Sequence, residues 1–189
     1  MKNIVVITGS PRKGGNSELL AKAFREGAEE AGHNVFLFET RSKKLSPCTA
    51  CNACFRKGRA CSVNDDFNEL APVLENADTI VFSTPLYWFT FPAHIKMIID
   101  KLYAFNGGPR PLKIKEAVLL VCAETDDIKD FDGIVTTYQS ILDYKKWENA
   151  GILKVPNVNY AGDVRKTDAL DKAKEMGELP PSGEWRRDN

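Results

Sequence analysis

The sequence IVVITGSPRKGGNS, at residues 4–17, decides the fold. The apolar run Ile4–Ile7 has the continuous hydrophobicity of a strand that is buried on both faces of a parallel sheet. The polar, glycine-rich segment Gly9–Ser17 follows it directly. Leu20, Phe24 and Ala28 then recur at helical spacing. Because a helix N-terminus offers free N–H groups and the positive end of the helix dipole, this stretch predicts a strand, an anion-binding loop and a helix.

The loop lacks the features of two common nucleotide motifs. Gly9 and Gly14 have the spacing of a Walker loop, but Gly15 and Asn16 stand where that loop needs Lys and Ser or Thr. The dinucleotide fingerprint is absent because Pro11 interrupts its glycine pattern. One terminal phosphate, such as that of FMN, suits the loop better; the alternative is a solvated turn. The candidate phosphate-binding side chains are those of Ser10, Arg12, Asn16 and Ser17.

The composition predicts a single cytoplasmic domain spanning residues 1–189. Lys plus Arg and Asp plus Glu number 26 each, so the formal net charge of zero gives no electrostatic reason to bind nucleic acid or an anionic membrane. The sequence shows neither the pattern of a signal peptide nor an apolar stretch of membrane-spanning length. Five cysteines in such a chain fit a reducing compartment better than a disulfide scaffold.

Strand and helix patterns alternate along the rest of the chain. Helical patterns begin near Asn64 or Asp65 and near Pro92, and cover 131–144 and 167–176. Five strand–helix repeats predict an α/β fold, a parallel sheet with helices on both faces. A cysteine-rich insertion occupies about 41–64, and we expect the tail 178–189 to be mobile or packed on a partner subunit. The four further predicted strands are Asn34–Phe38, Thr79–Ser83, Ala117–Cys122 and Gly151–Val155.

An aromatic segment follows the third predicted strand. Pro85–Pro92, with the sequence PLYWFTFP, holds four aromatic residues among eight. Ligands of open parallel sheets lie beyond the carboxyl ends of the strands, and a planar heteroaromatic ring needs flat apolar walls. The segment therefore indicates a ring-binding loop, with core packing or a dimer interface as the alternative.

Four cysteines follow the pattern C-x₂-C-x₂-C-x₆-C: Cys48, Cys51, Cys54 and Cys61. Cysteines at successive x₂ spacing hold iron–sulfur clusters in ferredoxin loops, so a [4Fe–4S] cluster is one interpretation. Zinc sites more often pair two separated knuckles. Free thiols without any metal are the third alternative. Cys122, within a predicted strand, is expected to be a buried small hydrophobe.

The chain resembles the NADPH-dependent FMN reductase and iron–sulfur flavoprotein family of the flavodoxin-like superfamily. The resemblance is carried by GSPRKGGNS at 9–17, CTACNACFRKGRACSVNDD at 48–66 and TPLYWFTFPAHIKMIIDK at 84–101. It implies FMN as cofactor, the strand order 2-1-3-4-5, and a homodimer or homotetramer whose neighbouring subunit helps close the flavin site. By the same resemblance, Ser10, Arg12, Asn16 and Ser17 hold the phosphate, and Pro85, Leu86, Tyr87 and Trp88 contact the isoalloxazine ring. Glu124, Thr125 and Asp126 are expected to line the flavin, although they depart from the small residues usual in the family.

These observations predict an FMN-dependent oxidoreductase. It would pass electrons from NAD(P)H through FMN to a quinone, a flavin or another acceptor, either a small molecule or a redox protein. The flavin carries the chemistry, so no catalytic side chain is predicted. One alternative is an electron carrier with a [4Fe–4S] cluster on the four cysteines of the insertion. A second is a flavin-free module with a zinc or redox-switch loop.

Overall fold

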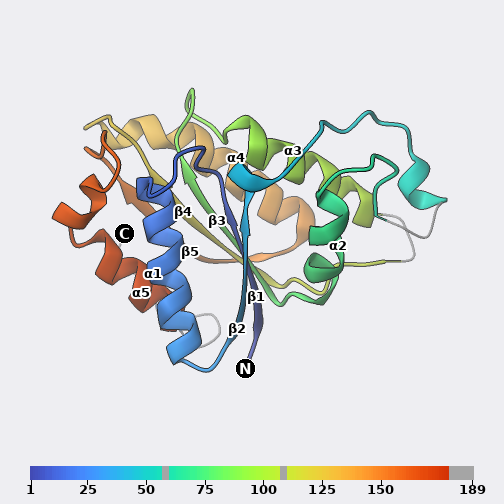
Figure 1. Ribbon diagram of the computed structural model, residues 1–189, viewed down its shortest axis with the longest axis horizontal. Helices are drawn as coiled ribbons and strands as arrows, with labels where there is room; N and C mark the ends of the chain where they lie inside the picture. Colours follow the sequence, from blue (N-terminus) through green and yellow to red (C-terminus); the bar gives the residue numbers. More distant parts are fainter. Residues whose placement is uncertain (57–59, 107–109, 179–189) are drawn as a thin grey trace.

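The computed structural model describes residues 1–56, 60–106 and 110–178. Its centre is a five-stranded parallel sheet of order β2-β1-β3-β4-β5 (Figure 1). All five predicted strands are present, and the strand order implied by the family resemblance is confirmed. The strands are β1 (Asn3–Thr8), β2 (Asn34–Glu39), β3 (Thr79–Pro85), β4 (Glu116–Cys122) and β5 (Glu148–Val155).

Helices cover both faces of the sheet, as the alternating pattern predicts (Figure 1). On one face lie α1 (Asn16–Glu30) and α5 (Ala169–Glu178); on the other lie α2 (Phe67–Asn76), α3 (Ala93–Lys101) and α4 (Asp132–Lys145). Strand residues alternate between the two cores. Ile4 and Val6 pack with α1 and α5, whereas Val5 and Ile7 pack with α2, α3 and α4. The short 3₁₀ helices are η1 (Thr40–Ser42), η2 (Ala53–Phe55), η3 (Leu102–Phe105), η4 (Ile128–Phe131) and η5 (Asp163–Lys166).

Two glycines bring α1 and α5 into backbone contact. A Cβ atom on Gly27 would lie 2.0 Å from the carbonyl oxygen of Lys174, and one on Gly177 would lie 2.1 Å from that of Phe24. This close crossing fixes α1, and with it the loop that precedes α1. The predicted tail begins at Glu178, which the structure shows as the exposed last residue of α5; residues 179–189 lie outside the described residues.

Element boundaries differ from the prediction by a few residues. β5 begins at Glu148, three residues early, because the backbones of Glu148 and Asn149 pair with β4 although their polar side chains carry no apolar signal. The helix expected from Asn64 or Asp65 begins at Phe67, and the Asp65 carboxylate accepts a hydrogen bond from the Phe67 N–H at 3.2 Å.

Within the described residues, no helix has the length and apolar character needed to cross a membrane. The cysteine-bearing insertion runs along the side of the molecule opposite to α1 and α5 (Figure 1). That residues 1–189 form one domain stays a prediction.

Candidate functional site

A cavity of about 570 Å³ lies where the strands end at their carboxyl termini. Its volume is in the range of sites that bind cofactors and other small molecules. The three loops singled out from the sequence meet there, and a fourth segment, after β5, completes the wall. The lining includes Ser10, Arg12, Gly15, Asn16 and Ser17; Pro85 to Phe89; Cys122 to Thr125 with Asp130; and Val158, Asn159 and Ala161.

The loop after β1 is a tight turn built around the buried side chain of Ser10. Its hydroxyl donates to the carbonyl oxygen of Arg12 at 3.0 Å and accepts from the Arg12 N–H at 3.2 Å. A Cβ atom on Gly15 would lie 2.5 Å from the Ser10 hydroxyl, so this position requires glycine. Gly14 adopts φ +69°, a left-handed conformation that favours glycine. The glycines predicted from the motif are therefore needed for the shape of the loop.

Ser17 supplies the clearest sign of a missing ligand. Its side chain is only 1% exposed, and within residues 1–56, 60–106 and 110–178 no nitrogen or oxygen atom is a hydrogen-bond partner of its hydroxyl. The neighbouring group is the thiol of Cys122: burial raises the pKa of this thiol to about 12, and its contact with the Ser17 side chain acts in the opposite direction. A thiol is a weak hydrogen-bonding group, so the Ser17 hydroxyl lacks a strong partner. Ser17 lies in the first turn of α1, where backbone N–H groups have no acceptor within the helix. A buried hydroxyl left unsatisfied costs up to about 1–3 kcal/mol, and a phosphate oxygen in the cavity would be a much stronger partner for Ser17 than a thiol.

The side chain of Asn16 joins the start of α1 to the segment after β5. Its amide nitrogen donates to the carbonyl oxygens of Val158 (3.3 Å) and Tyr160 (3.0 Å). Its amide oxygen accepts from the backbone N–H groups of Gly162 (3.0 Å) and Val164 (3.2 Å). These four hydrogen bonds occupy the side-chain amide and hold the segment after β5 against the start of α1. Asn16 also lines the cavity, and that it takes part in binding FMN stays a prediction.

Glu18, in the first turn of α1, is a buried carboxylate paired with two cations outside the loop. The Glu18 carboxylate is buried, accepts from the Gly14 N–H at 2.8 Å, and pairs with Lys22 at 2.5 Å and Arg41 at 3.8 Å. Burial raises the pKa of this carboxyl, but the hydrogen bonds from Lys22 and Gly14 outweigh that effect, and the pKa lies below its ordinary value. Lys22 and Arg41 thus pair with Glu18, while the exposed Arg12 lines the cavity.

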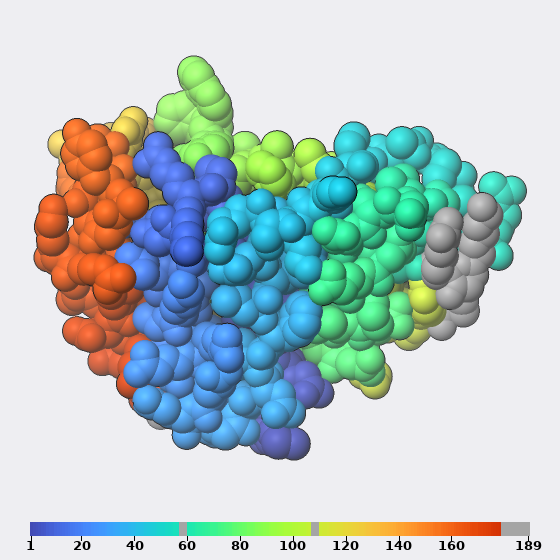
Figure 2. Space-filling view, in the orientation of Figure 1, coloured from blue at the N-terminus to red at the C-terminus, as the bar shows by residue number. Residues whose placement is uncertain are grey.

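The aromatic segment forms a tight hairpin at the rim of the cavity. The backbones of Tyr87 and Thr90 exchange two hydrogen bonds, of 3.1 and 3.0 Å. Between them Trp88 and Phe89 adopt φ values of +47° and +63°, which aromatic residues rarely occupy. Trp88 is 92% exposed, and Figure 2 shows the segment as the light-green projection at the top of the view. Such strain and exposure are typical of binding sites.

Some aromatic residues of the hairpin line the cavity and another packs in the core, so both roles considered for the segment are present. Tyr87, Trp88 and Phe89 line the cavity, as expected for a ring-binding loop. Phe91 is buried, with its ring centroid 5.6 Å from that of Phe82. This fourth aromatic residue belongs to the core.

The loop after β4 departs from the prediction at one position. Glu124 and Thr125 line the cavity as expected, but Asp126 lies outside it. Asp130 of η4 lines the cavity instead, and its carboxylate accepts from the Thr125 hydroxyl at 2.6 Å. The turn that begins η4 directs Asp130 back toward the strand end, and no sequence pattern marks that reversal.

Sequence reasoning also missed the fourth wall, formed by Val158, Asn159 and Ala161. The available signal was topological. A fifth parallel strand must end at the same edge as its neighbours, so the residues after Val155 were candidates.

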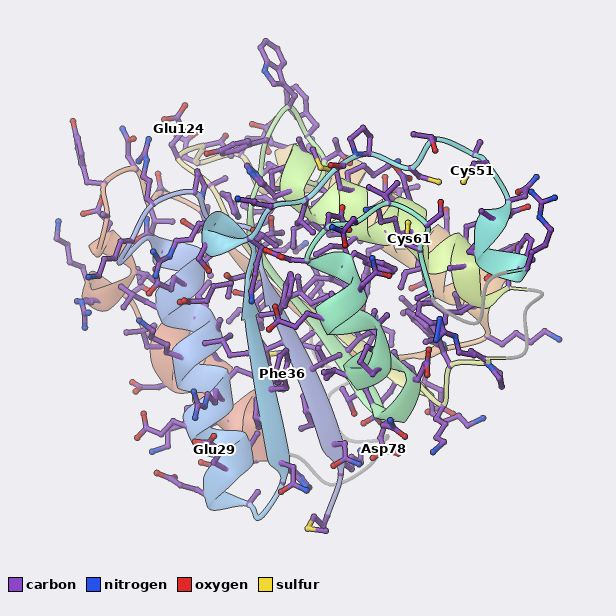
Figure 3. All side chains as sticks on the ribbon, turned by 45° about the vertical axis from the view of Figure 1, so that its right-hand side comes forward. Glu29, Phe36, Cys51, Cys61, Asp78 and Glu124 are labelled. Atoms are coloured by element: carbon purple, nitrogen blue, oxygen red, sulfur yellow. The ribbon has the colours of Figure 1, made fainter. Side chains whose placement is uncertain are left out.

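The four motif cysteines line one small hollow beside η3, apart from the cavity. Figure 3 shows Cys51 and Cys61 on one side of the molecule and Glu124 at the top on the other. Cys48 and Cys51 are exposed, and Cys54 and Cys61 are partly buried. A hydrogen bond with Ser62 lowers the pKa of Cys51 to about 7, whereas burial raises the pKa of Cys54.

In the described part of the chain, no three His, Cys, Asp or Glu side chains are arranged to hold a metal ion. The cysteines of this hollow are nevertheless soft ligands of the kind that iron–sulfur clusters take. The cluster therefore stays a prediction.

A parallel sheet with a glycine-rich loop after β1, an aromatic hairpin after β3 and a cavity between them defines a flavodoxin-like protein with a candidate nucleotide site. The family described as NADPH-dependent FMN reductase matches residues 2–136. The chain belongs to this family.

Curated relatives agree with that placement, and a solved structure shares the fold. An iron–sulfur flavoprotein of Methanosarcina thermophila is 36% identical over 141 residues, which cover 75% of this chain and 71% of the relative. One from Archaeoglobus fulgidus is 36% identical over 105 residues, 56% of this chain and 47% of that protein, so the match spans about half of its length. An NAD(P)H:quinone oxidoreductase from Methanothermobacter marburgensis shares the fold, with a TM-score of 0.72, 21% identity and coverage of 93% and 94%.

Proposed function

We propose that the chain binds FMN in the cavity and uses it to oxidise NAD(P)H, passing the electrons to a quinone, a free flavin or another acceptor. The observation that carries the proposal is the buried hydroxyl of Ser17, which has no nitrogen or oxygen partner among the described residues and lines the same cavity as the aromatic hairpin. One feature suits a phosphate and the other a planar ring, and FMN contains both.

The chain's own residues would bind and shield the cofactor. The guanidinium of Arg12, the hydroxyl of Ser17 and the first N–H groups of α1 would hold the phosphate. The residues from Pro85 to Trp88 would cover the ring. The FMN supplies the hydride and electron transfer when bound, while the protein orients it and sets its electrostatic surroundings.

The carboxylates at the opposite wall of the cavity would affect the reduction potential of the bound flavin. Glu124 and Asp130 line the cavity beside Thr125, whose hydroxyl donates to Asp130. Negative charge close to a flavin disfavours its anionic reduced form, so these two residues would lower the reduction potential of the cofactor.

The proposed assembly is a homodimer or homotetramer in which a neighbouring copy closes the cavity. Its support is the hairpin: Trp88 and Phe89 are exposed at the open rim, where a second subunit would bury them. Analytical ultracentrifugation of the wild type and of Trp88→Ser tests this proposal. It predicts that the variant forms an oligomer of fewer subunits than the wild type. A wild-type monomer would contradict it.

Titration of the purified protein with FMN, followed by anaerobic addition of NADPH or NADH, tests the function. We expect saturable flavin binding with one FMN per chain and bleaching of the flavin absorbance by one of the two nucleotides. Reoxidation rates with a quinone, free FMN and oxygen then rank the acceptors. A protein that takes up no FMN would contradict the proposal and favour the flavin-free zinc or redox-switch alternative.

A second candidate function is that of an electron carrier with an iron–sulfur cluster. It rests on the four cysteines around one hollow, and the names of the two relatives above support it. Iron, sulfide and zinc analysis of anaerobically purified protein separates the cases. About four iron and four sulfide per chain would support the cluster. Metal-free protein with rapid NAD(P)H oxidation would support the reductase alone.

A further inference from the structure

A buried ion pair lies beneath the cysteine hollow. The ammonium of Lys101, at the end of α3, contacts the carboxylate of Asp65, just before α2. Their side chains are only 1% and 3% exposed. The Lys101 ammonium also lies 5.4 Å from the ring centroid of Phe67, so its surroundings are largely apolar. Removing two charges from water is costly, and buried ion pairs rarely stabilise a protein more than apolar residues of similar size.

The Lys101–Asp65 pair lies with its positive end toward the hollow. Lys101 lines the hollow together with the four cysteines, whereas Asp65 does not. The positive end of the pair therefore faces the cysteine side, and the negative end is turned toward the backbone of the insertion. Asp65 accepts hydrogen bonds there from the N–H groups of Ser46 (2.8 Å) and Phe67 (3.2 Å).

Side chains at the start of α2 hold both ends of the cysteine segment. The Asp66 carboxylate accepts from the Lys44 N–H at 2.8 Å, before the first cysteine. The Asn68 amide oxygen accepts from the N–H of Cys61, the last cysteine, at 3.1 Å. Figure 3 shows Cys61 close to the α2 and α3 side of the molecule and Cys51 further out. Residues at the start of α2 thus fix both ends of the cysteine segment, and the buried ammonium of Lys101 lies beside the hollow.

We propose that Lys101 is a positioning residue of the cysteine hollow, whose buried ammonium, held by Asp65, favours a negatively charged occupant bound by the cysteines. A cluster ligated by four thiolates carries net negative charge and is such an occupant. This inference rests on the second candidate function. Because the Lys101 side chain approaches from the protein interior, water screens its charge little.

The test uses the full chain reconstituted anaerobically with ferrous iron and sulfide. The variants are Lys101→Met, Lys101→Arg and the double variant Lys101→Met with Asp65→Asn. Lys2→Met is the matched control, because the Lys2–Glu116 pair is also largely buried but lies at the amino end of the sheet. The readouts are iron retained per chain, the rate of iron loss to a chelator, the midpoint potential of the iron–sulfur absorbance, and FMN content.

We expect Lys101→Met to lose iron about tenfold faster than the wild type, as is typical when a residue supporting metal ligands is removed. Its midpoint potential should move to a more negative value, since removal of a nearby positive charge disfavours the gain of an electron. Lys101→Arg should behave as the wild type does. The double variant should behave like Lys101→Met, because it lacks the cation but leaves no carboxylate unpaired.

Three results would overturn the inference. The first is that Lys101→Met loses iron at the wild-type rate and has an unchanged midpoint potential. The double variant could restore wild-type behaviour, which would trace the defect to the unpaired Asp65. A wild type that takes up no iron would overturn both the inference and the second candidate function, while the FMN titration reports separately on the flavin proposal. If Lys101→Met fails to fold, the double variant and Lys101→Arg still decide the question.

Discussion

The side-chain amide of Asn16 donates a hydrogen bond to the carbonyl oxygen of Tyr160 at 3.0 Å. This contact joins the first residue of α1 to the segment after β5, at the opposite end of the chain. Together with its bonds to Val158, Gly162 and Val164, it leaves the Asn16 side chain fully occupied. One amide therefore sets the position of the fourth cavity wall relative to the phosphate loop.

Asn16→Ala should weaken FMN binding although the side chain makes no direct contact with phosphate in this account. The variant leaves buried backbone groups without partners, at a cost of about 1–3 kcal/mol, and frees the segment 158–164. We expect FMN affinity to fall about tenfold, measured by quenching of flavin fluorescence. Asn3→Ala, at the amino end of β1 and away from the cavity, is the control. Wild-type affinity in Asn16→Ala would show that the wall does not depend on this amide.

Gly133→Ala should disturb the aromatic hairpin. Helix propensity alone favours alanine in α4 by up to about 1 kcal/mol. However, a Cβ atom at Gly133 would lie 2.5 Å from the carbonyl oxygen of Phe89, so the hairpin must move. Overpacking of this kind costs about 1–3 kcal/mol, and we expect FMN affinity to fall about tenfold. Ser140→Ala, on the exposed side of the same helix, should have no effect. Equal or higher FMN affinity in Gly133→Ala would contradict the proposal that the hairpin packs against Gly133.

Glu18 should make stability depend on pH in the acid range. Because the pKa of this carboxyl in the folded protein lies below its ordinary value of 4.5, its contribution to stability is present above that value and is lost as the pH falls below it. Glu18→Gln should therefore show a smaller drop in melting temperature between pH 7 and about pH 3 than the wild type. Glu29→Gln, with an exposed ion pair on the same helix, should keep the wild-type dependence. Equal slopes for Glu18→Gln and the wild type would contradict this role.

Most of the fold was predictable because its signals are local and repeated. Continuous apolar runs mark the strands, and the spacing of Leu20, Phe24 and Ala28 marks the first helix. The strand order came from the family resemblance and not from these patterns. The start of β5 was missed because residues from Glu148 pair through their backbone, which leaves no trace in side-chain periodicity.

Site residues could be predicted only where the residues of a single loop suit one part of the ligand, such as its phosphate or its ring. Ser17 and the aromatic hairpin could be identified from the sequence, and both line the cavity. The role of Asn16 could not, since it depends on carbonyls more than a hundred residues away. Asp130 took the place expected for Asp126 because the turn at η4 decides which carboxylate faces the cavity.

The central claim is that the loop after β1 binds the phosphate of FMN, and a comparison of FMN with riboflavin, which lacks the phosphate, tests it most directly. Hydrogen bonds to charged groups contribute about 1.5–3 kcal/mol, so Ser17→Ala and Arg12→Met should each weaken FMN binding about 10- to 100-fold. Both variants should bind riboflavin as the wild type does, so that the preference for FMN over riboflavin shrinks by that factor. Unchanged FMN affinity in both variants, or an equal loss for FMN and riboflavin, would contradict the account.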